Sequence, residues 1–248
     1  DVTLNGSYST LINKKEPDIG FSYDIRDMDV QKAFYAFNTI QSIMPIGKFL
    51  SGKLNSQLSM VGKMQSDMFP KLMSLTGKGN LLLLKGVLMK FAPLEKLANV
   101  LQIDRLRSIS LKELKNYFEF ANGKVLIKPF TVKIDDIEML ISGLHGFDQS
   151  IDYAIKMKLP RRLMGSKGNE FVNGLASKIN DKGIPLKLGE TISLDIKMTG
   201  TFSNPFIGIN LAGMVDDVVK DMEQQAKDFA QAKLDSAKQK AKDSLELV

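Results

Sequence analysis

Apolar and polar side chains alternate with a period of two along several stretches of this chain, most cleanly at 151–159 and 192–198. The apolar positions of these two stretches are Ile151, Tyr153, Ile155, Met157 and Leu159, then Ile192, Leu194, Ile196 and Met198. A period of two is typical of β-strands that bury one face and leave the other in water. The chain is therefore constrained to build a sheet with one long apolar side.

Further strands are expected at 2–8, 19–25, 54–60, 80–90, 108–120, 124–134, 137–147 and 206–211. Short connections rich in Asn, Gly, Asp and Pro separate many of them, including 121–123, 135–136, 147–149 and 203–205. Loops this short join neighbouring antiparallel strands, because parallel strands require long crossovers. Small-residue–Gly pairs such as Ser51-Gly52 and Ser142-Gly143 recur beside strands and indicate bulges or bends that curl a sheet.

Helical periodicity is confined to shorter segments and the tail. Helices are expected at 29–44, capped by Asp29, at 67–75, capped by Asp67, at 93–101 and at 168–179. From Met214 the sequence indicates one long helix whose first half docks, since large apolar residues become rare after Phe229.

These patterns predict an α+β fold with one large curved, mainly antiparallel β-sheet of about ten strands. Short helices are expected on its inner face, together with a long C-terminal helix. We expect two regions, a β-rich domain over 1–212 and a C-terminal helical tail over 213–248.

The composition excludes several kinds of chemistry. The chain has no Cys, which rules out disulfides, thiolate metal sites and cysteine nucleophiles. Its 44% hydrophobic and 25% charged residues are ordinary globular values, and no apolar run is long enough for a membrane-spanning helix. The net charge of +6 is compatible with anionic lipid or nucleic acid, but also with a merely solubilising surface.

No catalytic, metal or cofactor site is predicted. His145 is the only histidine and falls on the apolar side of a strand, where a structural role is expected. The segment 47–53 approaches a phosphate-binding loop, but Leu54 stands where Ser or Thr must hold magnesium. Aromatic residues are not interleaved with basic ones in a way typical of nucleic-acid binding. We therefore expect a non-enzymatic protein that does not bind nucleic acid.

Several short motifs resemble the C-terminal region of AsmA-like proteins. The segment 196–207 is similar to the closing strand pair of that family, with Thr199-Gly200-Thr201 followed by an Asn204-Pro205 turn. The segment 141–153 and the Leu159-Pro160 ending resemble its penultimate hairpin. Further similar segments are 29–34, 75–79 and 91–94, so the resemblance extends over roughly residues 1–211.

The resemblance implies a Gram-negative envelope protein whose bulk lies in the periplasm and serves outer-membrane assembly. It implies membrane association through a segment outside this sequence, and no catalytic residues. The leading expectation is an apolar β-groove that handles or transfers phospholipid or another acyl-chain lipid. The alternative is a structural or assembly module that binds envelope proteins without a lipid ligand.

If lipid binds, the two cleanest alternating strands are expected to contact it. The predicted lipid-contact residues are Ile151, Tyr153, Ile155, Met157, Leu159, Ile192, Leu194, Ile196 and Met198. Arg161 and Arg162 follow the first of these strands and are the predicted headgroup contacts, since paired cations can bind a phosphate. The alternative is that the helix at 168–179 covers these apolar side chains and that the arginines are solvated.

Overall fold

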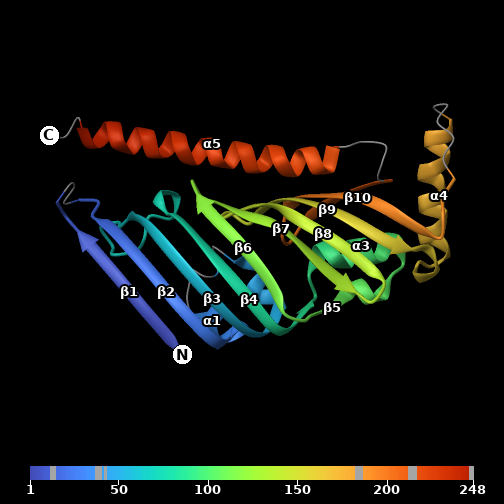
Figure 1. Cartoon of the computed structure of the whole chain (residues 1–248), viewed down its shortest axis with the longest axis horizontal. Helices are drawn as coiled ribbons and strands as arrows, with labels where there is room; N and C mark the ends of the chain where they lie inside the picture. Colours follow the sequence, from blue (N-terminus) through green and yellow to red (C-terminus); the bar gives the residue numbers. More distant parts are fainter. Residues whose placement is uncertain (12–14, 37–40, 42–43, 182–186, 212–216, 246–248) are drawn as a thin grey trace.

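A computed structural model describes residues 1–11, 15–36, 41, 44–181, 187–211 and 217–245. Eleven strands form one antiparallel sheet in the order β1-β2-β3-β4-β6-β7-β8-β9-β10-β11, with β5 paired to β4 (Figure 1). The strands are β1 Val2–Ser9, β2 Asp18–Asp29, β3 Leu50–Lys63, β4 Thr76–Met89, β5 Ser108–Leu111, β6 Leu114–Ala121, β7 Lys124–Ile134, β8 Ile137–Gly146, β9 Ser150–Pro160, β10 Thr191–Thr201 and β11 Pro205–Leu211. The expected α+β architecture, dominated by one curved antiparallel sheet, is confirmed.

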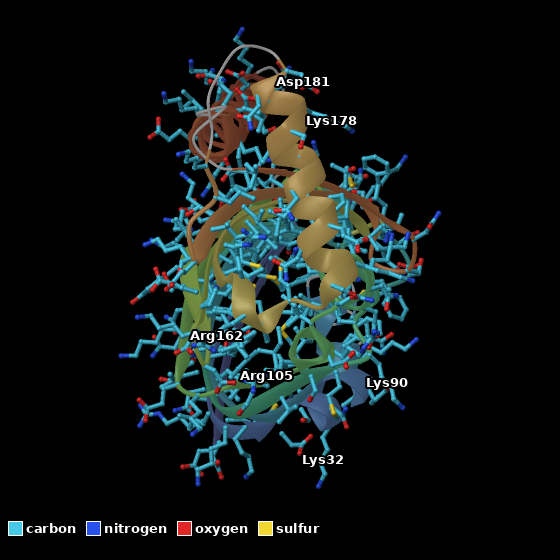
Figure 2. All side chains as sticks on the ribbon, turned by 90° about the vertical axis from the view of Figure 1, so that its right-hand side faces the viewer. Lys32, Lys90, Arg105, Arg162, Lys178 and Asp181 are labelled. Carbon is cyan, nitrogen blue, oxygen red and sulfur yellow. The ribbon has the colours of Figure 1, made fainter. Side chains whose placement is uncertain are left out.

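Strand register places the apolar side chains of neighbouring strands on one face. Ile155 of β9 is opposite both Ile141 of β8 and Ile196 of β10, and Phe21 of β2 is opposite Met60 of β3. Residues directly opposite in a ladder project from the same face, so the alternation in each strand adds up to one continuous apolar surface. Viewed from one end, the sheet curls around this inner face (Figure 2).

Bulges interrupt the ladders where the sheet bends. The register shifts between Ser51 and Lys53, where Gly52 has a φ of 119°. A Cβ at Gly52 would lie 2.8 Å from the Cα of Gly86 on β4, so both the conformation and the space require glycine there. The stretch expected as one strand at 108–120 divides into β5 and β6, with Glu113 in the left-handed conformation (φ 51°) between them.

Three helices pack against the inner face. α1 (Val30–Ala36) follows β2, and the Asp29 carboxylate accepts a hydrogen bond of 2.9 Å from the Lys32 amide, which confirms the expected cap. The rest of the helix expected to residue 44 lies mostly outside the described residues. α3 (Ala92–Leu101) and α4 (Ser166–Asn180) confirm the helices expected at 93–101 and 168–179, and both join one apolar cluster with β9 and β10.

The helix expected at 67–75 is wrong. Met64 pairs with Pro70 across a turn, and only one 3-10 turn, Leu72–Ser74, forms before β4. Asp67 does not cap a helix, because its carboxylate accepts a hydrogen bond of 3.1 Å from the Phe69 amide two residues on. This contact stabilises a turn instead, as short acidic side chains commonly do.

The long C-terminal helix α5 (Asp217–Leu245) is confirmed and runs across the outer face of the sheet (Figure 1). Phe229 packs there against Ala121, Leu126 and Leu144. Contacts continue past the first half of the helix, since the Ser236 hydroxyl lies 2.8 Å from the Asn122 side-chain oxygen. Docking therefore extends further along α5 than the loss of large apolar residues after Phe229 indicates.

Candidate functional site

A large cavity lies between the curved sheet and the helices on its inner face. Its volume is about 780 Å³, within the range of about 300–1,000 Å³ that is usual for small-molecule sites. Strands β1 to β9 all contribute to its wall, as do α1 and the start of α3, and β10 contributes Met198. β2, β3, β6 and β7 contribute large apolar side chains to the wall, among them Phe21, Leu58, Phe118 and Ile127.

The lining is almost entirely hydrocarbon. None of the described residues that line the cavity is Asp, Glu, Lys or Arg. This follows from the alternation of the strands, which sends charged side chains to the outer face and apolar ones inward. An uncharged apolar molecule can therefore enter without stripping water from an ionised group.

Several polar side chains in the wall bind one another or the backbone. The Tyr23 and Ser56 hydroxyls lie 3.2 Å apart, and the Ser56 hydroxyl donates to the Asn80 carbonyl at 2.8 Å. On the other side of the cavity the Tyr153 hydroxyl lies 2.9 Å from His145 Nδ1. These contacts satisfy polar atoms that would otherwise be costly next to apolar surface.

Burial keeps Tyr23 and Tyr153 in the neutral form. It raises the pKa of Tyr153 well above the ordinary value of a phenol, and it raises the pKa of Tyr23 against the opposing effect of the Ser56 hydrogen bond. The His145 ring also packs edge-on against Phe202, with ring centroids 5.7 Å apart. The structural role expected for His145 agrees with these contacts.

The structure divides the predicted lipid-contact residues into two groups. Four line the cavity, and these are Ile151, Tyr153, Ile155 and Met198. The other five do not line it and are buried in the apolar cluster that includes α3 and α4, and these are Met157, Leu159, Ile192, Leu194 and Ile196. Lipid contact at the first group stays a prediction. The second group is packed with helices, as expected under the alternative that protein covers these apolar side chains.

Arg161 and Arg162 lie outside the cavity wall, in the 3-10 turn Arg161–Leu163 that precedes α4. Figure 2 shows Arg162 near the start of this helix. Arg161 Nε donates to Asn169 Oδ1 at 3.0 Å, and its Nη2 donates to Asn173 Oδ1 at 2.9 Å. Arg162 forms an ion pair with Asp136 in the β7–β8 turn. Both guanidinium groups thus already have protein partners, and headgroup binding there stays a prediction.

Most residues of the cavity wall lie outside the predicted lipid-contact set. Ile19, Phe21, Tyr23 and Ile25 alternate as regularly as the residues of β9, and 54–60 was expected as a strand. Strand periodicity does not indicate which part of the apolar face the helices leave uncovered, so it cannot locate the cavity.

Comparisons with known proteins return no matching family model, no matching curated protein and no matching solved structure. Within the described part of the chain, no helix combines the length and apolarity needed to cross a membrane. The same residues contain no group of three or more His, Asp or Glu side chains able to hold a metal ion.

Proposed function

We propose that this protein binds an acyl-chain lipid, such as a phospholipid, in the cavity of its curved sheet and handles or transfers it without catalysing a reaction. The observation that carries the proposal is the cavity of about 780 Å³ with no ionisable carboxylate, ammonium or guanidinium group among its described lining residues. The resemblance to AsmA-like proteins supports the setting, which is outer-membrane assembly in the periplasm of a Gram-negative bacterium.

Hydrocarbon is the ligand chemistry that this wall favours. Each Å² of apolar surface removed from water contributes roughly 25 cal/mol, so a buried acyl chain supplies most of its own binding energy. The inner side chains of β1 at the rim of the cavity, among them Leu4 and Tyr8, remain exposed. A lipid whose tail lies inside can therefore keep its polar headgroup in water at this rim.

A second candidate is a scaffold that binds envelope proteins without lipid. It is favoured by three exposed apolar side chains in the β3–β4 connection, Met68, Phe69 and Met73, each more than 60% exposed. Clustered exposed apolar residues commonly mark protein-binding surfaces. This surface lies outside the cavity wall, so the two candidates can be separated by mutation.

The test is native mass spectrometry of the protein purified from bacterial membranes, comparing Met60→Arg with Ser59→Arg. Met60 lines the cavity and is half-buried, whereas Ser59 is exposed on the opposite face of the same strand. The two variants therefore add the same charge to adjacent residues of β3. We expect lipid to co-purify with the parent protein and with Ser59→Arg.

We expect the amount of lipid bound to Met60→Arg to fall about tenfold or more. A charge in the apolar wall lowers the binding free energy by more than the ~1.4 kcal/mol that corresponds to this factor. Equal lipid content in both variants would contradict binding in the cavity. A parent protein without lipid but with a defined protein partner would favour the scaffold, and a triple Met68→Ser, Phe69→Ser, Met73→Ser variant should then lose that partner.

A further inference from the structure

The two edges of the sheet differ in how they are covered. At one edge, β11 lies beside α3 and α4, and Lys96 of α3 donates from Nζ to the Pro205 carbonyl at 2.6 Å. At the other edge, β1 pairs with β2, and no second described strand pairs with it. An uncovered edge presents backbone donors and acceptors to any strand that can pair with it.

The register of β1 identifies which backbone groups face outward. Asp1 and Arg26 exchange two hydrogen bonds, at 2.9 and 3.0 Å, and are therefore a hydrogen-bonded pair. Such pairs alternate along an antiparallel ladder with pairs whose N–H and C=O groups point away from the partner strand. The outward-facing residues of β1 are therefore Val2, Leu4, Gly6 and Tyr8.

Native sheets usually protect such an edge with Lys, Pro, a bulge or a short strand. β1 is eight residues long, its sequence VTLNGSYS contains neither charge nor proline, and its pairing with β2 has no register shift. The inner side chains of Val2, Leu4 and Tyr8 are 49%, 59% and 54% exposed. Among the described residues, this edge thus combines outward-facing backbone groups that no strand pairs with and apolar side chains that remain exposed.

We propose that β1 pairs with β1 of a second copy of this chain, antiparallel about a two-fold axis at Asn5. This register places Val2 opposite Tyr8 of the second copy and Leu4 opposite Gly6, so that every outward-facing residue joins a pair that exchanges two hydrogen bonds. A second copy fits because β1 is uncharged and no like charges meet along the strand. The exposed apolar side chains of both copies then cover one another across the axis.

The pairing also has a consequence for the cavity. Val2, Leu4 and Tyr8 line the cavity, and side chains of the second copy opposite them project from the same face. The two inner faces therefore join into one surface across the dimer. This joined surface forms whichever ligand the cavity holds.

Cysteine cross-linking tests the register directly, because the chain contains no cysteine. Asn5 lies on the axis, so it is opposite Asn5 of the second copy in a non-hydrogen-bonded pair. The Cα atoms of such a pair are about 4.5 Å apart, a distance that a disulfide can span. Thr3 faces Ser7 of the second copy, so the two Thr3 residues lie about four residues, or roughly 13 Å, apart along the strand. We expect Asn5→Cys to form a disulfide-linked dimer on mild oxidation and Thr3→Cys to remain monomeric on a non-reducing gel.

The double variant Thr3→Cys, Ser7→Cys should restore the cross-link, since each cysteine then faces the other in the second copy. Sedimentation measures the association without cysteines. The unmodified protein should sediment as a dimer, and Leu4→Pro should be a folded monomer by circular dichroism and sedimentation, because proline removes an outward N–H. Equal cross-linking of Asn5→Cys and Thr3→Cys, a monomeric parent protein, or cross-links only to another protein would overturn the proposal.

Discussion

The three strands at each end of the sheet have the same sequence pattern on their inner face but different surroundings, and we call these two regions the open half and the covered half. In the open half, formed by β1, β2 and β3, the alternating side chains border the cavity and many are partly or fully exposed. In the covered half, formed by β9, β10 and β11, α3 and α4 pack on the apolar side chains, and Met157, Leu194 and Ile196 are completely buried. Alternation thus identifies the apolar face of a strand, but it does not say whether protein or a ligand covers that face.

Chain connectivity explains the difference. α4 joins β9 to β10, so it is tethered at the end of these strands, and it contacts α3 and β11. α3 follows β4 and packs against α4, at a point where Gly168 lies beside the Leu101 backbone. The segment between β1 and β2, in contrast, contains no described helix. α1, which follows β2, contacts both β2 and β3, so the open half is covered in part and keeps the rest of its apolar surface available to the cavity.

The largest expected effect comes from placing the same charge in each half, with Ile196→Asp and Phe21→Asp. Ile196 is completely buried, so an aspartate there has no access to water, and we expect the free energy of unfolding to fall by more than about 4 kcal/mol. Phe21 is half-buried at the cavity wall, where water can solvate the carboxylate, and a loss of about 1–2 kcal/mol is expected. Urea unfolding of both variants measures the difference. Equal losses would contradict the division into two halves.

Much of the fold follows from the sequence, because strand alternation and helix caps act locally. Residues 150–160 and 191–201 form strands, as expected from their periodicity, and Asp29 and Pro93 begin helices as their chemistry predicts. The cavity does not follow in the same way, since it depends on contacts between elements distant in sequence. Asp67 illustrates the limit even locally, because the same side chain can cap a helix or stabilise a turn.

A smaller effect is expected from loosening the cover itself, with Gly168→Ala on α4. A Cβ at Gly168 would lie 2.1 Å from the Leu101 carbonyl oxygen of α3, so the two helices must separate. We expect a loss of about 1–3 kcal/mol in unfolding free energy, as is usual for overpacking. The matched control is Gly174→Ala on the same helix, where a Cβ would meet no atom within 4 Å.

Gly174→Ala should stabilise the protein slightly, by up to about 1 kcal/mol, because alanine favours helix more than glycine. Thermal unfolding of the two variants compares them directly. If Gly168→Ala does not lower the unfolding free energy either, α3 and α4 do not pack closely enough to cover the apolar side chains of the covered half.

The outer face offers the mildest test, because the described side chains of α5 make few apolar contacts with it. Phe229 is the one large apolar side chain of the described α5 residues that is buried, at 6% exposure. Polar contacts therefore carry much of the docking. Lys233 of α5 lies 2.9 Å from one carboxylate oxygen of Glu119 on β6, and Lys128 lies 2.7 Å from the other.

Hydrogen bonds from Lys128 and Lys233 hold the pKa of Glu119 below its ordinary value of 4.5. A carboxylate with a lowered pKa stabilises the folded state above its unfolded pKa, and this contribution is lost as the pH falls through the folded pKa. We therefore expect the docking of α5 to weaken as the pH falls below about 4.5, by ~1 kcal/mol or less because these side chains remain in contact with water. A tryptophan introduced as Phe229→Trp reports this weakening by fluorescence, since the chain has no other tryptophan. Glu119→Gln in the same background should abolish the pH step. If Glu119→Gln shows a pH step of unchanged size, another titratable group causes the step. If the inner face opens at the same pH, the two faces of the sheet are not independent.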